Sequence, residues 1–327
     1  MRRREFISLL GGAVASWPVA ARAQQAERIR RVGFLAAGSE KDVHWQAQVA
    51  AFKEALRLLG WAPDRNIQIE IRWARSDVAR SQAYARELVT WHPDAIVAGA
   101  TFSLAALQRV TTTIPIVFAQ VSDPVRGGFV TSLAHPGGNI TGFALYEYAI
   151  AAKWLELLKQ LAPNLARLGV LYDPALVSNT GQLPEIRAAA RSEQVHAFAV
   201  RDANQIQRAI ENFARGPNGG LIVLPSAVTV QHRAPLIASA AMHRLPAVYA
   251  YRHFVVDGGL ASYGVDILDS YRSAASYVDR VLKGEKPGEL PVQYANKFQL
   301  VINLRTAKSL GLDPPVPLLA RTDEVIE

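Results

Sequence analysis

Short apolar runs recur along the chain at intervals of roughly 20 to 35 residues, the size of a β–α–β unit. The first four are "VGFLAA" (32–37), "IQIEIRW" (67–73), "DAIVAGA" (94–100) and "IPIVFAQV" (114–121). The segments between them place apolar residues at helical spacing, and in the first segment one helix face carries Trp45, Val49, Phe52, Leu56 and Leu59. This alternation predicts buried strands that are joined to one another by helices.

The same cycle begins again in the second half of the chain. Its apolar runs are "RLGVLYD" (167–173), "HAFAVRD" (196–202), "GGLIVLP" (219–225) and "LPAVYAY" (245–251). We therefore expect two α/β lobes, each a parallel sheet with helices on both faces. Right-handed crossovers bring the carboxyl ends of the strands to one edge, where such sheets bind ligands, so we expect the binding site in the cleft between the lobes.

A glycine-rich stretch, "AHPGGNITG" (134–142), separates the two sets of strands. It is not a nucleotide-binding loop, because the chain has no two glycines separated by a single residue and no Gly-Lys-Ser/Thr sequence. Gly137, Gly138 and Asn139 instead follow Pro136, and this combination favours positive φ angles at the glycines and the asparagine and a sharp reversal of the chain. We predict that the chain crosses here from the first lobe to the second.

Other motifs of catalysis or metal binding are missing. The seven histidines have no metal-ligand spacing, the chain has no cysteine, and no serine lies in a G-x-S-x-G sequence. Asp123 and Asp173 end predicted strands, where an aspartate can act as a catalytic acid but more often caps a helix. We expect no metal, no cofactor and no enzymatic activity.

The N-terminus has the three parts of an export leader. In "MRRREFISLLGGAVASWPVAARAQQ", Arg3 and Arg4 form a twin-arginine pair, an apolar segment follows, and Ala21-Arg22-Ala23 fits a cleavage site before Gln24. The apolar segment, 9–21, is too short to remain as an anchor across roughly 30 Å of hydrocarbon. Without a cysteine the mature chain can carry no lipid on sulfur and no disulfide. We predict a twin-arginine signal peptide at 1–23 and a free protein in the periplasm.

Charge indicates no polyanionic partner. Removal of the leader leaves 32 Lys and Arg against 27 Asp and Glu, a surplus of about five. The basic residues form no long run and no stripe with aromatic side chains, so nucleic-acid binding is not expected. The roughly 300 residues that remain exceed the usual size of a single core, which favours two domains.

Four long stretches resemble the ABC-transporter solute-binding proteins that include tryptophan- and tyrosine-binding members. They are "PIVFAQVSDPVRGGFVTSLAHPGGNITGF" (115–143), "GVLYDP" (169–174), "LPAVYAYRHFVVDGGLASYGVD" (245–266) and "YVDRVLKGEKPGELPVQYANKFQLVINLRTAKSLGL" (277–312). The leader and the ending "LLARTDEVIE" also resemble this family, so the likeness covers essentially the whole chain.

The resemblance implies a type I periplasmic-binding-protein fold, with two doubly wound parallel-sheet lobes joined by a three-strand hinge. It assigns residues 24–138 and 266–327 to the first lobe and 139–265 to the second, and it returns "FQLVINL" (298–304) to the first lobe. It also implies a small-molecule ligand, an ABC permease in the inner membrane as partner, and a monomer.

The expected ligand is a small organic molecule, aromatic or carboxylate-bearing. We expect it to contact Gly38, Ser39, Thr101, Phe102, Ser122, Asp123, Tyr172, Asn179, Ser226, Tyr251, Arg252 and Tyr263. Aromatic rings at several of these positions suit a planar ligand, although tyrosines also pack at the rims of sheets with the hydroxyl in water. Arg252 can hold a carboxylate through two hydrogen bonds, or it can pair with Asp257 or another carboxylate and never touch a ligand.

Two functions of different class follow. The first is a periplasmic binding protein of an ABC import system that captures its ligand by hinge closure. The alternative is an exported two-domain α/β enzyme that acts on a small metabolite in the same cleft. A sugar-repressor-like regulator is excluded, since a leader occupies the place of a helix-turn-helix.

Overall fold

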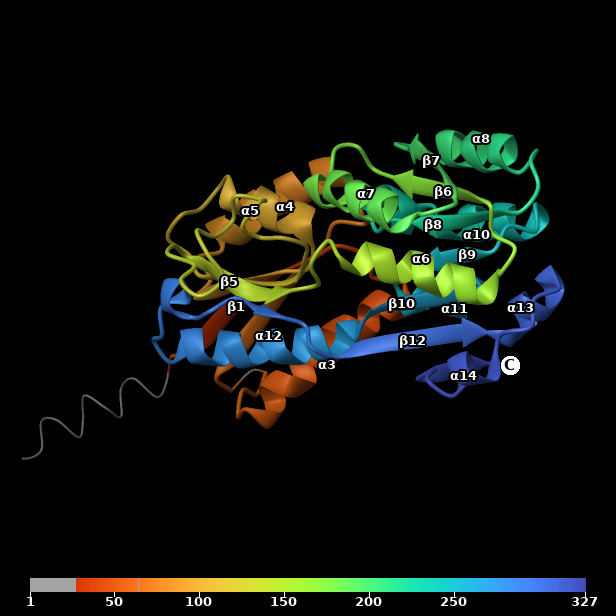
Figure 1. Cartoon of the computed structure of the whole chain (residues 1–327). Helices are drawn as coiled ribbons and strands as arrows, with labels where there is room; N and C mark the ends of the chain where they lie inside the picture. The colour runs from red at the N-terminus through yellow and green to blue at the C-terminus, as the bar shows by residue number, and fades with distance from the viewer. Residues whose placement is uncertain (1–27, 64) are drawn as a thin grey trace, which may run out of the picture.

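The computed structural model describes residues 28–63 and 65–327, so the predicted signal peptide at 1–23 lies outside the described residues. Two sheets lie in two lobes, each with helices against it (Figure 1). Strand order is β11-β5-β4-β3-β1-β2 in the first sheet and β13-β12-β10-β9-β8-β6-β7 in the second. Two α/β lobes with largely parallel sheets are the type I periplasmic-binding-protein fold predicted from the sequence, and this prediction is confirmed.

The first lobe is a parallel sheet between two pairs of helices. Its strands are β1 (Arg30–Ala36), β2 (Ile67–Trp73), β3 (Ala95–Ala98), β4 (Ile116–Val121), β5 (Ile140–Ala144) and β11 (Gln293–Tyr294). Its helices are α3 (Val43–Leu58), α4 (Val78–Thr90), α5 (Thr101–Gln108) and α12 (Ile267–Leu282), with the turn η1 (Pro287–Glu289). Helices α3 and α12 cover the face that carries Phe34, while α4 and α5 cover the face that carries Leu35. Burial on both faces explains why the inner strands β3, β4 and β5 are buried and largely apolar along their length.

The second lobe has a larger sheet. Its strands are β6 (Arg167–Tyr172), β7 (Gln194–Ala199), β8 (Gly219–Val223), β9 (Ala247–Tyr249), β10 (Ala261–Val265), β12 (Phe298–Asn303) and β13 (Glu324–Ile326). Its helices are α6 (Ile150–Leu161), α7 (Val177–Ala189), α8 (Ala203–Phe213), α9 (Ala227–Gln231), α10 (Arg233–Met242), α11 (Arg252–Val256), α13 (Leu304–Leu310) and α14 (Val316–Leu319). All strand pairs are parallel except β10 with β12, which is antiparallel.

Helix α3 illustrates how the apolar pattern fixes an element. The Asp42 side chain accepts a hydrogen bond from the backbone N–H of His44 and caps the helix. Four of the five predicted core residues are buried, but Leu59 is 41% exposed because the helix ends at Leu58 and Leu59 is its C-cap.

The glycine-rich stretch lies inside the first lobe, so the predicted crossing at 134–142 is wrong. Strand β5 follows it and pairs with β4 of the first sheet. Gly142, at φ 150°, brings its backbone so close to β4 that a Cβ would lie 2.2 Å from the carbonyl oxygen of Phe118. The chain enters the second lobe only after Ala144, through residues 145–149. Turn-forming residues thus mark a turn before the next strand and carry no information about which sheet that strand joins.

The placement of residues 298–304 in the first lobe is also wrong. Strand β12 pairs with β10 and β13 in the second sheet (Figure 1). The preceding passage through the first lobe consists of α12, η1 and β11, and β11 pairs with β5. The lobes are therefore connected at 145–149, at Asp266 and at 295–297.

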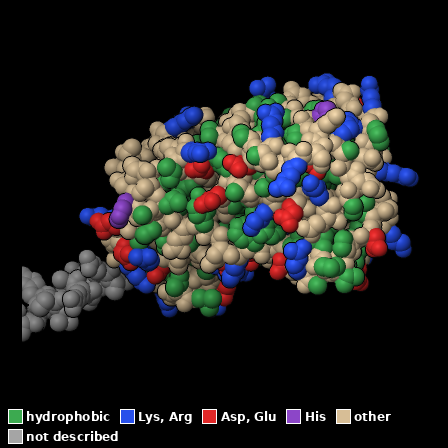
Figure 2. Space-filling model, viewed as in Figure 1, with side chains coloured by type: hydrophobic (Ala, Val, Ile, Leu, Met, Phe, Trp, Pro, Cys, Tyr) green, Lys and Arg blue, Asp and Glu red, His purple; other side chains and the backbone are tan. Residues whose placement is uncertain are grey.

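Charged side chains of both signs are interspersed on the visible face (Figure 2). Across the described residues, no helix combines the length and the apolar character that crossing a bilayer requires.

Candidate functional site

Side chains from both lobes meet at the carboxyl edges of the two sheets. Ser122 follows β4, Tyr146 lies two residues after β5 at the first connection between the lobes, and Tyr251 lies two residues after β9. The Tyr146 hydroxyl is buried, and the polar side chains that influence its pKa are those of Tyr251, of Ser122 and of Gln182 from α7. We call Ser122, Tyr146, Gln182 and Tyr251 the junction cluster, because it joins both lobes and a connection between them.

Several polar atoms at this junction are buried without a partner. Among the described residues, the Tyr146 hydroxyl and both amide atoms of Gln182 make no hydrogen bond, and neither do Oε1 of Gln48 and Nε2 of His253. Gln48 lies one helical turn after His44, whose ring is 5.4 Å from that of His253 in the second lobe. These atoms therefore come from α3, from the first connection and from the second lobe.

Buried polar atoms without partners are costly. Each such atom costs about 1–3 kcal/mol of folding free energy, so nearly all of them are satisfied in native proteins. Several at one junction indicate a place where a bound molecule can complete the hydrogen bonds. A ligand with its own donors and acceptors would supply them.

The ionisable groups of the junction are neutral. Burial raises the pKa of Tyr146 well above its ordinary value, and the neighbouring Tyr251 raises it further. Burial likewise raises the pKa of Tyr251. Burial, followed by the nearby His44 and Arg233, lowers the pKa of His253 to about 3. The junction therefore offers neutral hydroxyl, amide and imidazole groups.

Aromatic rings surround these polar atoms. Tyr146 packs edge to face on Trp154, with ring centroids 5.7 Å apart, and Tyr251 stacks on His253 at 5.4 Å. The Tyr271 hydroxyl donates a hydrogen bond of 3.2 Å to the carbonyl of Gly99, at the end of β3. An environment of this kind can hold an apolar or aromatic body and satisfy polar groups at its edge.

The structure places the predicted site residues of the first lobe as follows. Gly38 lies against the indole of Trp45, so close that a Cβ would come within 2.2 Å of the ring. The Ser39 hydroxyl accepts a hydrogen bond from the backbone of Lys41. Thr101 begins α5, whose N-cap residue offers no side-chain acceptor, and Phe102 packs against a cluster that contains Trp45 and residues of the second lobe.

The two aspartates at strand ends each accept a backbone hydrogen bond within a turn, and neither caps a helix, since the N-cap residue of α7 is Leu176. Oδ1 of Asp123 accepts from the backbone N–H of Arg126 at 3.0 Å, and Oδ1 of Asp173 accepts from that of Ala175 at 2.9 Å. Asp123 has a φ of 43°, and Gln120, three residues earlier, has a φ of 95°. Positive φ at two non-glycine residues on either side of Ser122 is strain of the kind that concentrates at functional sites.

In the second lobe, two predicted residues are engaged by the backbone. Asn179 is fully buried; its Oδ1 accepts from the N–H of Asp173 at 2.9 Å and its Nδ2 donates to the carbonyl of Pro225 at 3.1 Å. Ser226 caps α9 by accepting from the N–H of Thr229. Tyr172, at the end of β6, packs at the margin of the core beneath α6.

Arg252 pairs with a carboxylate of the protein in this structure, which is the second of the two roles expected for it. Its guanidinium forms two hydrogen bonds, of 2.5 and 2.6 Å, with the carboxylate of Glu324 in β13. The alternative predicted from the sequence, pairing with a carboxylate of the protein, is correct, although Asp257 is not the partner. Arg252 begins α11 and points toward the last strand, a pairing that needs the sheet order to be known.

Tyr263 also lies away from the junction cluster. Its ring stacks on Phe298 at 5.6 Å, with the Lys153 ammonium 5.7 Å from its centroid. It lines a surface hollow of about 290 Å³ together with residues of α6 and α14. It faces this side because alternate residues of a strand point to opposite faces of the sheet.

Sequence reasoning missed Gln48, Tyr146, Gln182 and His253. Gln48 and Gln182 are polar residues on buried faces of amphipathic helices, and this polar exception was the signal available for them. Tyr146 was missed because the crossing was placed several residues too early.

A family model, a curated protein and solved structures each match most of this chain. The family model described as "ABC transporter substrate binding protein" matches residues 42–326. A curated "Tyrosine-binding protein" of Clostridioides difficile is 28% identical over 264 residues, which cover 80% of this chain and 75% of that protein.

Two solved structures are also similar. One is titled as the ABC domain from Streptococcus pneumoniae in complex with L-Trp, at 26% identity, and the other as a conserved domain protein from Vibrio cholerae, at 27% identity. Each has a TM-score of 0.84 and covers 91% of this chain and 100% of its own. Proteins of the matching family bind small molecules, work with a membrane permease and are typically extracytoplasmic. The chain belongs to the ABC transporter substrate-binding protein family.

Proposed function

We propose that this protein is the periplasmic ligand-capturing component of an ABC import system and that it binds an aromatic amino acid or a similar small molecule between its lobes. The observation that carries the proposal is the set of buried, unpartnered polar atoms on Tyr146 and Gln182 at the lobe junction. In a member of this family, such atoms are explained by a ligand that completes their hydrogen bonds.

The ligand class rests on two supports. Relatives are described as tyrosine-binding and as bound to L-Trp. Tyr146, Tyr251 and His253 supply rings on which an aromatic side chain can pack. The uncapped start of α5 leaves backbone N–H groups that can donate hydrogen bonds to the ligand carboxylate, in the role first assigned to Arg252.

The test is a ligand screen on the purified mature chain. Calorimetry and thermal unfolding should detect binding of L-tryptophan, L-tyrosine or L-phenylalanine, with L-leucine as a ligand that lacks the ring. Chromatography of each recovered ligand distinguishes this proposal from the exported enzyme, because a binding protein returns its ligand unchanged. Turnover of any of these ligands would favour the enzyme.

Capture requires the lobes to close on the ligand and to open for release. Solution scattering should show a smaller radius of gyration when the ligand is bound. An unchanged profile at saturating ligand would rule out hinge closure and leave a rigid site.

Export is proposed from Arg3, Arg4 and the Ala21-Arg22-Ala23 site. Mass spectrometry of a periplasmic extract should find a chain that begins at Gln24, and gel filtration should find a monomer. A chain that retains Met1 in the cytosol would contradict export.

A further inference from the structure

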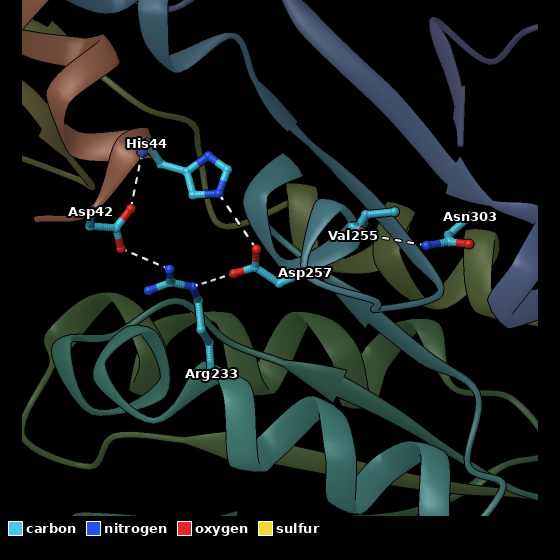
Figure 3. Close-up of polar contacts among 6 residues, drawn as sticks. All are labelled: Asp42, His44, Arg233, Val255, Asp257 and Asn303. Atoms are coloured by element: carbon cyan, nitrogen blue, oxygen red, sulfur yellow. Dashed lines mark hydrogen bonds and ion pairs between the residues drawn. The ribbon is translucent and has the colours of Figure 1, made fainter. Parts of the chain in front are cut away.

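A second set of contacts joins the lobes on the α3 side of the junction. Nη2 of Arg233, at the start of α10 in the second lobe, lies 2.7 Å from Oδ2 of Asp42 in the first lobe. Nε of the same guanidinium lies 2.6 Å from Oδ2 of Asp257 within the second lobe. The other oxygen of Asp257 lies 3.6 Å from Nε2 of His44 in the first lobe. Figure 3 shows these four side chains converging between α3, α10 and the end of α11.

Each lobe holds its own half of this set in position. Asp42 is fixed by capping α3 through His44 N, so its second oxygen is directed outward to Arg233. Arg233 is fixed by Asp257, which leaves one edge of the guanidinium free to cross to the first lobe. Fixed partners lose less side-chain entropy when they pair, so such a contact is stronger than one between free surface side chains.

The contacts are also shielded from water. Only 22% of the Arg233 side chain and 15% of the Asp42 side chain are exposed. Trp45, the third residue of α3, is buried beside them in the apolar cluster that includes Phe254 of the second lobe. Separation of the lobes would break the Asp42–Arg233 and His44–Asp257 contacts and uncover this indole.

We propose that Asp42, His44, Arg233 and Asp257 form a latch that favours the closed arrangement of the lobes even without a ligand. The latch supplies part of the free energy of closure, so it sets how tightly any ligand is retained without touching that ligand. The apparent affinity for a ligand then depends on the fraction of protein that is already closed, because the apparent dissociation constant rises as that fraction falls. The latch itself can be tested without a ligand, and only its predicted effect on ligand affinity rests on the proposed function.

The lack of native cysteine makes closure directly measurable. Val78 at the start of α4 and Val177 at the start of α7 are exposed and lie on different lobes. Spin labels on cysteines at these two positions report the distance between the lobes by double electron–electron resonance. The ligand-free protein should show a dominant closed distance, and Arg233→Gln should move most of the population to a broader, different distance.

Two further variants separate the latch from simple damage. Asp42→Asn keeps a good helix cap while removing the charge, and it should open the lobes in the same way as Arg233→Gln, with little further effect in the double variant. Arg252→Gln removes an ion pair of similar geometry that lies entirely within the second lobe, and it should leave the distances unchanged. If Arg233→Gln fails to fold, Asp42→Asn decides the question alone.

The affinity arm uses L-tryptophan as the probe. Arg233→Gln and Asp42→Asn should each weaken its binding about tenfold, whereas Arg252→Gln should not. Unchanged distances in both latch variants, or an equal change in Arg252→Gln, would overturn the proposal. If L-tryptophan does not bind the unmodified protein, the ligand proposal fails, while the distances in the ligand-free protein still decide whether the latch exists.

Discussion

Tyr146→Phe should make the ligand-free protein more stable and the ligand complex weaker. The Tyr146 residue is 3% exposed and its hydroxyl has no hydrogen-bond partner in the structure. Removing a buried, unpaired hydroxyl recovers part of a desolvation cost of about 1–3 kcal/mol, so the free energy of unfolding should rise by about 1 kcal/mol. For a chain of this size, the melting temperature should rise by about 2 °C.

The same substitution at Tyr277 provides a matched control. Tyr277 is also 3% exposed, but its hydroxyl donates to the carbonyl of Pro291 at 2.7 Å and accepts from Nε2 of Gln293 at 3.1 Å. Tyr277→Phe leaves both partners unpaired and should lower the free energy of unfolding by about 1 kcal/mol. The two substitutions remove the same atom from residues of equal overall exposure, and we attribute opposite signs to the hydrogen bonds that only Tyr277 makes.

The assay is urea unfolding of the ligand-free variants together with calorimetric titration of L-tryptophan. Tyr146→Phe should weaken binding by about three- to tenfold, the usual loss for one hydrogen bond to a ligand, while Tyr277→Phe should bind normally. If Tyr146→Phe destabilises the ligand-free protein and leaves binding unchanged, the hydroxyl has a partner within the fold and the junction cluster is not the site.

Three other changes test the remaining contacts. Burial opposes the ionisation of Glu193, yet the Lys159 ammonium at 2.6 Å and backbone N–H groups lower its pKa to about 2. The ionised carboxylate should therefore stabilise the fold by about 3 kcal/mol above pH 4.5, and this stabilisation should disappear as the pH falls towards 2. In urea unfolding, the stability of Glu193→Gln should change little over the same pH range. An equally steep decline in the variant would refute this assignment. Arg252→Ala should cost less than about 1 kcal/mol of stability and leave ligand affinity unchanged, because its partner is Glu324 on the surface; a large loss of affinity in calorimetry would restore its role as an anchor. Asn179→Ala should lower the free energy of unfolding by about 2–4 kcal/mol, because two backbone groups lose their partner, and unchanged thermal stability would show that water replaces the amide.

The leading elements of the fold could be predicted from local pattern. Each of the eight apolar runs contains or overlaps a strand, and the helix face of Trp45, Val49, Phe52 and Leu56 is buried as predicted. The spacing of apolar residues within a short stretch of chain distinguishes a strand buried on both faces from a helix buried on one face, so these elements can be predicted from neighbouring residues alone.

The site was less accessible to this reasoning. Strand ends pointed to the edge of each sheet at which Ser122 and Tyr251 lie, and both residues were among those predicted. The pairing of Arg252 with Glu324, 72 residues away, and the unpaired state of Tyr146 and Gln182 depend on which side chains from distant segments face one another. Spacing along the chain carries no information about such contacts.

The sequence by itself determined the repeating strands and helices, the two-lobe architecture and, through resemblance, the family. Only the tertiary structure decided that β5 completes the first sheet, that β12 joins the second, and that Arg233 reaches across to Asp42. The physical reason is that an apolar strand is equally suited to either sheet, and a charged side chain to any opposite charge. The choice is made by long-range packing, which places one neighbour within reach and excludes the others.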